Sequence, residues 1–361
     1  MARANKTRPQ KPPSIAKNTM PSVERTPGYK PWFLRSLITV FVAISVALLY
    51  DTYFNQTKNN PLFEVVDLPG RGKGVVAARD IQRGELVIRE KPLFIVPHSI
   101  SGSPTTLISH LVQSLNDVDY HAFFNLSYVN FPNNMDPKTH RDEVALAIFQ
   151  TNAVAAGEDV GIFPRMARLN HGCSSAFNVV YSWRQAEGEI VVHALQNISK
   201  GQELLTTYTD TKRPRNVRRE FLSKHYGFHC ACSVCSLSPS QSQASDERLN
   251  SISDLYNLFS TWGTHSISGT EAIDVVRRIR SLTDEEGYYS ERGQLFADAA
   301  LVSLSHSDVS AARAWAKAAA EWYGYELGQD SEQVANMVVI IARPEAHRAW
   351  GTREHLVVGG P

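Results

Sequence analysis

Residues 226–236 read YGFHCACSVCS, which places three cysteines at the spacing Cys-x-Cys-x-x-Cys. The only other cysteine of the 361-residue chain, Cys173, closes the segment RLNHGC at residues 168–173. Zinc prefers four ligands in a tetrahedron, and closely spaced cysteines on a tight turn can supply three of them. We therefore predict one structural Zn²⁺ held by Cys173, Cys230, Cys232 and Cys235. Such a site would bring the segment after residue 225 against the segment around residue 170.

Other interpretations of the cysteines stay open at this point. His225 or His229 could replace one thiol, and the cysteines could instead be free thiols or form one strained disulfide. Lys224 and His225 favour thiolates through their positive charge. A disulfide-dense secreted scaffold is excluded, because four cysteines are too few for one.

The overall composition is that of a globular protein, with 43% hydrophobic and 20% charged residues. Lys and Arg number 37 and Asp and Glu number 36, so the net charge is +1. Because no global field attracts a polyanion, we expect no direct binding of nucleic acid.

Three further segments carry side chains suited to a binding site. Asn170-His171 lies just before the predicted ligand Cys173, although such a pair is usually a turn or a satisfied core pair. Residues 201–210, GQELLTTYTD, predict a strand that ends in Tyr208, a pattern that is also typical of a core strand. Residues 70–74, GRGKG, run into a strand and allow close backbone approach to a ligand, with a simple turn as the alternative.

The chain divides into regions of different periodicity, and together they predict an α+β protein. Residues 62–96 alternate as short strands do, whereas 105–155 repeat with a helical period. The polar, serine-rich residues 237–246 are predicted to be a linker. Residues 247–361 are predicted to be an all-α domain, with hairpins like those of tetratricopeptide repeats.

The first 54 residues predict a basic tail followed by a membrane anchor. Residues 1–30 hold seven Lys or Arg and one Glu, and an uncharged run follows at 36–50. Extended to 31–54, this run is long enough to span a bilayer once. A cleaved signal peptide and a buried helix are the alternatives. The charges place the bulk of the chain away from the cytosol, whereas zinc thiols favour the cytosol, so orientation and organelle stay open.

Taken in order, these motifs resemble those of SET-domain protein-lysine methyltransferases with a cysteine-rich post-SET segment. The run from Glu203 to Cys230 is most similar to the subfamily that also carries a MYND zinc finger, which is missing here because all four cysteines are used. The resemblance covers residues 62–236 and implies a SET-type fold of short sheets with a helical insert.

The resemblance also implies roles for individual residues. It implies that S-adenosylmethionine is bound by Arg71, Gly72, Lys73, Asn152, Asn170, His171, Tyr208 and Phe228. It places the Tyr208 hydroxyl at the point of methyl transfer and Tyr226 in the channel for the substrate lysine. The implied partner is a protein presenting a lysine, with a further protein partner expected at the helical C-terminal region.

One departure from the family pattern bears on activity. After Asn-His-x-Cys the family commonly has Pro-Asn, where this chain has Ser175-Ala176 followed by Phe177-Asn178. The sequence leaves open whether Asn178 takes the missing role. A catalytically silent SET scaffold and a membrane-tethered zinc protein without cofactor are therefore kept as alternatives to the enzyme.

Overall fold

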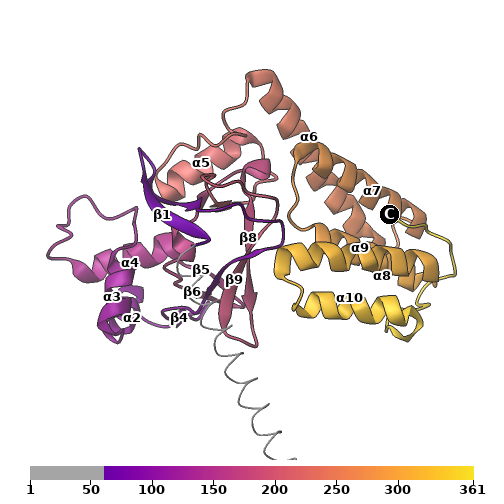
Figure 1. The fold of residues 1–361 in the computed structure, drawn as a ribbon, viewed down its shortest axis with the longest axis horizontal. Coiled ribbons are helices and arrows are strands. Elements are labelled where there is room, and N and C mark those ends of the chain that lie inside the picture. Colours follow the sequence, from indigo (N-terminus) through magenta and orange to yellow (C-terminus); the bar gives the residue numbers. More distant parts are fainter. Residues whose placement is uncertain (1–60) are drawn as a thin grey trace, which may run out of the picture. The chain divides into compact units, whose positions relative to one another are not determined.

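The computed structural model of the chain describes residues 61–361. The predicted basic tail at 1–30 and the predicted membrane anchor at 31–54 therefore lie outside the described residues. Within residues 61–361, no helix is both long and apolar enough to cross a membrane. A strand-rich part comes first in this stretch, and helices follow it to the C-terminus (Figure 1).

Short strands form four small sheets in the described part of the chain. In spatial order these are β1 (Phe63–Leu68) and β2 (Gly72–Ala77); β3 (Leu86–Glu90), β9 (Glu189–Ala194) and β8 (Val179–Arg184); β4 (Ile95–Val96), β6 (Asp159–Gly161) and β5 (Val154–Ala156); and β10 (Leu205–Thr206) with β7 (Asn170–His171). The central strand β9 is buried along its whole length. Apolar residues of several sheets, among them Val75, Ile88 and Val192, share one core.

The predicted helical stretch at 105–155 is confirmed as an insert between β4 and β5. It contains α2 (Pro104–Gln113), α3 (Asp117–Phe124) and α4 (Arg141–Asn152). The Ser103 hydroxyl caps α2 by accepting from the Thr106 N–H, and Pro104 occupies the first turn, where its missing N–H costs nothing. The insert has its own core, which includes Phe123 and Ile148.

The pairing of β7 with β10 is parallel and joins segments more than thirty residues apart. Leu205 lies opposite Asn170, and Thr206 lies opposite His171. The Gly172 N–H then donates to the Thr206 carbonyl at 2.8 Å. This pairing places Asn170, His171 and the following Cys173 beside the strand that leads to Tyr208.

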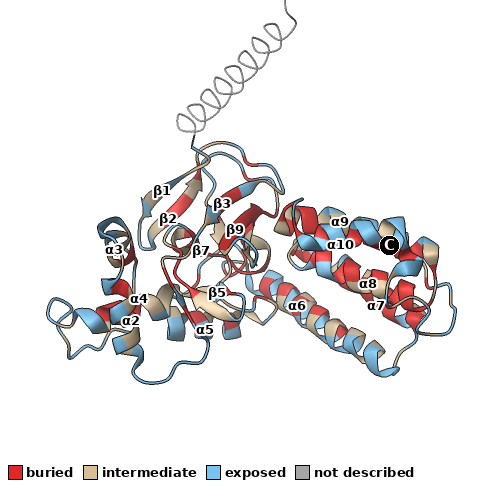
Figure 2. Ribbon diagram, turned by 90° about the horizontal axis from the view of Figure 1, so that it is seen from below, coloured by how far each residue is buried: buried red, intermediate tan, exposed pale blue. Residues whose placement is uncertain are grey.

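After α5 (Arg215–Tyr226), the chain is helical, as predicted. The helices are α6 (Pro239–Ser260), α7 (Gly269–Glu286), α8 (Arg292–Ser305), α9 (Val309–Leu327) and α10 (Glu332–Ala342). Small residues let α9 pack closely on α8, because Ala312, Ala316 and Ala319 are fully buried together with Trp315. Figure 2 shows the buried residues concentrated along α8 and the facing side of α9.

The predicted linker at 237–246 is wrong, because most of it is the start of α6. Ser238 and Gln241 form a capping box, and Pro239 stands in the first turn. Serine, proline and glutamine at these positions therefore indicate the start of a helix, although the same residue types are also common in linkers. Ser242 and Ser245 have polar side chains but are buried in the fold. The post-SET cysteines thus lead into the helical region within a few residues.

Candidate active site and metal centre

The four cysteines meet at one point, as predicted. Their sulfur atoms all lie within 4.8 Å of one another. Cys173 Sγ is 3.7 Å from Cys235 Sγ and 4.0 Å from Cys230 Sγ. A tetrahedral zinc ion with Zn–S bonds of about 2.3 Å requires sulfur atoms roughly 3.8 Å apart. None of the four forms a disulfide, and neither His225 nor His229 belongs to the cluster. The donor set therefore fits one zinc ion.

Helix α5 shapes the loop that carries three of these cysteines. The helix ends at Tyr226, and Gly227 adopts φ +69°, which turns the chain back toward the cluster. Arg219 then reaches from α5 into this loop. Its Nε donates to the Cys230 carbonyl at 3.0 Å, and its second guanidinium nitrogen donates to the Cys235 carbonyl at 2.8 Å. The loop is thus held by the same helix from which it departs.

His171 links the cysteine cluster to Tyr208. The Tyr208 N–H donates to His171 Nδ1 at 3.0 Å, so the ring proton must lie on Nε2. His171 Nε2 lies 3.0 Å from Cys173 Sγ and donates to it. Burial lowers the pKa of His171 to about 4, which keeps the ring neutral in this arrangement. A metal-ligating thiolate commonly accepts such a second hydrogen bond.

Tyr208 is fixed at its hydroxyl as well as at its backbone. The hydroxyl donates to the Leu169 carbonyl at 2.7 Å. The centroid of the Tyr208 ring lies 4.9 Å from that of the Tyr226 ring, so the two aromatic rings pack against each other. Burial raises the pKa of Tyr208 well above its ordinary value, so the phenol stays protonated.

A cavity of ≈ 370 Å³ opens beside this tyrosine pair. Besides Tyr208 and Tyr226, its lining includes Tyr181, Met166, Leu169, Asn152 and the threonines on either side of Tyr208. Tyr226, predicted to lie in the channel for the substrate lysine, is among the residues that line this cavity. Asn152, predicted to contact the cofactor, also lies here, with its amide nitrogen donating to the carbonyls of Ser127 and Ile148 at 2.7 Å each.

The glycine-rich turn meets Asn170 through a carboxylate that the sequence reasoning missed. Glu203 accepts from Arg71 at 2.7 Å and from Asn170 Nδ2 at 3.0 Å. Asn170 Nδ2 also donates to the Lys73 carbonyl at 3.2 Å. A Cβ on Gly74 would lie 2.8 Å from Asn170 Nδ2, so this close approach requires glycine. Glu203 begins the run that resembles the SET and MYND subfamily, but no local pattern in the sequence indicated this contact.

The other residues predicted to bind the cofactor differ in how they lie relative to Asn170 and Glu203. Gly72 has φ +69° and open space where a side chain would stand. The Lys73 ammonium pairs with Asp67 across the hairpin at 3.1 Å, so only its carbonyl faces Asn170. The Phe228 ring lies 6.4 Å from that of His171. Both ring nitrogens of His171 are used within the protein, which leaves its backbone for any ligand.

Comparison with known proteins agrees with this geometry. Residues 72–209 match the protein family described as the SET domain. This part of the chain is a SET domain. The chain is similar to "Histone-lysine N-methyltransferase set5" of Schizosaccharomyces pombe, with 26% identity over 294 residues, which cover 79% of this chain and 85% of that protein.

Two further similarities are more limited in extent or strength. "N-lysine methyltransferase SMYD2-B" of Danio rerio is 42% identical over 76 residues, which cover 21% of this chain and 17% of that protein. A solved structure, the SET domain of LSMT bound to lysine and AdoHcy, aligns over 82% of this chain and 88% of that one, with 14% identity and a TM-score of 0.34. A TM-score this low does not establish a shared arrangement.

Within the SET domain, Asn178 has a structural role. It is 1% exposed, and its side chain donates to the Glu203 carbonyl at 2.9 Å and accepts from the Leu205 N–H at 2.8 Å. Asn178, which follows the altered turn at Ser175-Ala176, therefore fastens the segment that runs from Glu203 into β10. Asn178 thus holds the start of β10 in place.

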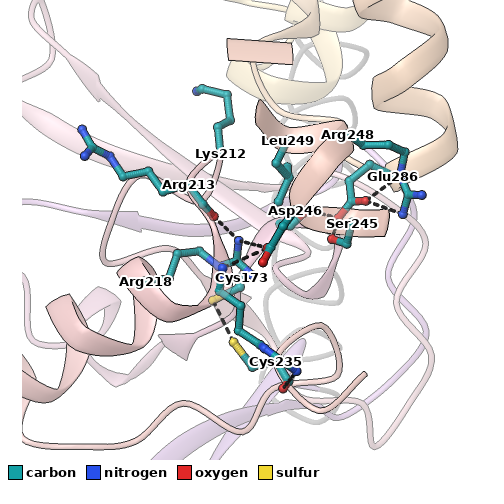
Figure 3. A network of polar contacts seen from close by, with 12 residues as sticks. Cys173, Lys212, Arg213, Arg218, Cys235, Ser245, Asp246, Arg248, Leu249 and Glu286 are labelled. Atoms are coloured by element: carbon teal, nitrogen blue, oxygen red, sulfur yellow. Dashed lines mark hydrogen bonds and ion pairs between the residues drawn. The ribbon is translucent and has the colours of Figure 1, made fainter. Parts of the chain in front are cut away.

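The turn after Cys173 is attached to the helical region through Glu286, at the end of α7. This buried carboxylate accepts from the Ser174 hydroxyl at 2.8 Å and from the Ser245 hydroxyl at 2.7 Å. It also accepts from Arg248 through two nitrogens, at 2.9 and 2.8 Å. Figure 3 shows Glu286 between Ser245 and Arg248. The zinc ligand Cys173 is thus one residue away from a contact between the SET domain and α7.

Removing this carboxylate is expected to destabilise the protein. Glu286→Ala leaves the Arg248 charge and two buried hydroxyls without their acceptor, so we expect the free energy of unfolding to fall by about 3 kcal/mol. Urea denaturation followed by tryptophan fluorescence measures the change. The exposed neighbour Glu285→Ala is the matched control and should shift stability by less than about 0.5 kcal/mol. Equal effects of the two substitutions would contradict the prediction.

Proposed function

We propose that this chain is an S-adenosylmethionine-dependent protein-lysine N-methyltransferase. The observation that carries the proposal is the placement of Tyr208, whose hydroxyl is fixed beside an aromatic cavity while its backbone is tied through His171 to the cysteine cluster. The similar proteins of Schizosaccharomyces pombe and Danio rerio are named as lysine methyltransferases, which supports the same activity.

The residues around Glu203 suit the binding of an amino-acid-like cofactor. Arg71 is half exposed at 54%, so its guanidinium is available to a carboxylate in addition to Glu203. Asn170 commits its amide nitrogen to the protein, which leaves its oxygen to accept from an ammonium group. S-adenosylmethionine, when bound, supplies an activated methyl group. Phe228 and the open turn at Gly72 would border the rest of the molecule.

The aromatic cavity suits a lysine side chain that has lost its proton. Three tyrosines line it, so an aliphatic stem can pack there, and the water that it displaces from a bound amine would lower the pKa of that amine. Because the Tyr208 hydroxyl donates its proton to Leu169, its oxygen offers only lone pairs to a neighbouring group. The protein thus contributes mainly by positioning the reacting groups in a dry site.

Binding and transfer assays test the proposal together. We expect calorimetry to detect one molecule of S-adenosylmethionine per folded, zinc-loaded chain, and labelled cofactor to transfer its methyl group to lysine in a protein. If such a chain bound no cofactor, the enzyme would be excluded and the alternative, a silent SET scaffold, would be favoured. That alternative draws support from α10, which exposes Val338 at 54% and Val339 at 61%, as a surface for a protein partner.

The sequence supports two further proposals, one for the C-terminal helices and one for the N-terminal region. We infer a tetratricopeptide-like, partner-binding role for the helices from α6 to α10. A pull-down that compares the unaltered chain with Val339→Glu, which alters the exposed face of α10, tests this role. We also infer that residues 31–54 anchor the chain in a membrane as a single span. Alkaline carbonate extraction of cell membranes tests the anchor, and release of the chain into the supernatant would reject it.

A further inference from the structure

Arg218 is a fully buried arginine beside the cysteine cluster. It lies in α5 with 1% of its side chain exposed. One terminal nitrogen donates to the Arg213 carbonyl and lies 3.6 Å from Asp246 Oδ1. Its Nε has no hydrogen-bond partner among the described residues. Burying a cation and an unpaired donor is costly, so this position calls for a further anionic acceptor.

Besides Asp246, the cysteine cluster is a second source of negative charge beside Arg218. Figure 3 shows the Arg218 side chain extending between Cys173 and Asp246. One Zn²⁺ with four thiolates carries a net charge of −2. A buried guanidinium compensates that charge.

Asp246 brings the helical region into this arrangement. It lies in α6, where its Oδ1 also accepts from the Arg215 N–H at the start of α5, at 2.9 Å. It is 24% exposed, so solvent only partly screens its attraction for Arg218. One carboxylate of α6 therefore holds both the first turn of α5 and the buried guanidinium.

We propose that Arg218, held by Asp246 of α6, is the charge partner of the zinc–thiolate cluster and sets how firmly the zinc is retained. The outer shell of a metal site commonly has this effect, through charge and hydrogen bonds to the ligands. The proposal makes α6 part of the metal centre, although all four zinc ligands belong to the SET and post-SET residues. It requires no methyl donor and no substrate.

The rate of zinc release to an excess of a coloured chelator tests the proposal. We expect Arg218→Met to release zinc at least about tenfold faster than the unaltered chain, the usual effect of losing an outer-shell partner. Arg218→Lys keeps the charge and should restore most of the retention. Asp246→Asn should also speed release, but by less. Absorbance of the Co²⁺-substituted protein checks that each variant still forms a four-thiolate tetrahedral site.

Arg292→Met is the matched control. Arg292 is also buried, at 6% exposure, and pairs with Asp284 at 2.7 Å in the helical region. It should leave zinc release unchanged, because its contacts are with Asp284, Thr283 and aromatic rings. If Arg218→Met does not fold, Arg218→Gln takes its place in the same assay. Release at the unaltered rate from either folded variant, or equal acceleration by Arg292→Met, would overturn the proposal and leave the proposed methyltransferase standing.

Discussion

Tyr208→Phe is expected to reduce methyl transfer by about 10²- to 10³-fold, the usual loss when one preorganised polar group is removed from a reacting centre. The substitution deletes the hydroxyl that donates to the Leu169 carbonyl, on a tyrosine that lines the aromatic cavity. It keeps the ring that packs against Tyr226 and the backbone N–H that donates to His171. The turnover number with saturating cofactor and protein substrate measures the loss.

Two measurements separate a lost chemical group from a damaged fold. Zinc content should stay near that of the unaltered chain, because the phenol oxygen contacts the Leu169 carbonyl and none of the cysteines. Cofactor affinity should fall by far less than methyl transfer. Tyr181→Phe is the matched control, since Tyr181 lines the same cavity and also has its pKa raised by burial. It should cost less activity than Tyr208→Phe. A fully active Tyr208→Phe protein would remove Tyr208 from the reaction.

Cys173→Ser is expected to abolish zinc binding and, with it, the active site. A structural zinc site in a small peptide contributes about 10–16 kcal/mol, as much as the whole stability of a domain. Without the metal, the loop at 228–236 loses its attachment to the segment around Cys173. His171 then loses the sulfur that orients its ring, and Tyr208 loses its fixed partner. We expect less than about 0.1 zinc per chain and no measurable methyl transfer.

Limited proteolysis locates the damage caused by Cys173→Ser. New cleavage should appear between residues 226 and 237, because that loop has few apolar contacts besides those of the cluster. Ser236→Ala is the control, since it removes only a hydrogen bond to the Ala231 carbonyl in the same loop. A Cys173→Ser protein with full zinc content would show that Cys173 is not a ligand, and the predicted site would fall with it.

The metal centre could be predicted from the sequence because thiol chemistry is specific. Zinc is one of few partners for Cys-x-Cys-x-x-Cys, and the chain offers a single further cysteine. Asn170, His171 and Tyr208 could be predicted from motifs that surround this set. The alternation of strands before residue 96 and the helical period after residue 247 likewise predicted the α+β architecture.

Polar residues with partners far along the chain could not be predicted in the same way. Glu203 has no pattern that distinguishes it from a surface carboxylate until β10 pairs with β7 and brings it to Asn170 and Arg71. Glu286 meets Ser174 across 112 residues of sequence. Ser242 and Ser245 indicated a linker because serine is polar, and the local sequence does not show that packing buries them.

Local chemistry and local periodicity thus predicted the cysteine cluster and the helices, and the resemblance to SET domains pointed to Tyr208. Only the tertiary structure decided which charge meets which. Carboxylates and guanidiniums are usually solvated on a surface, and the sequence does not say which of them packing will remove from water. Once buried, each charge needs a partner of opposite sign. For Arg218, Asp246 of α6 is one partner, and the zinc–thiolate cluster is the other that we propose.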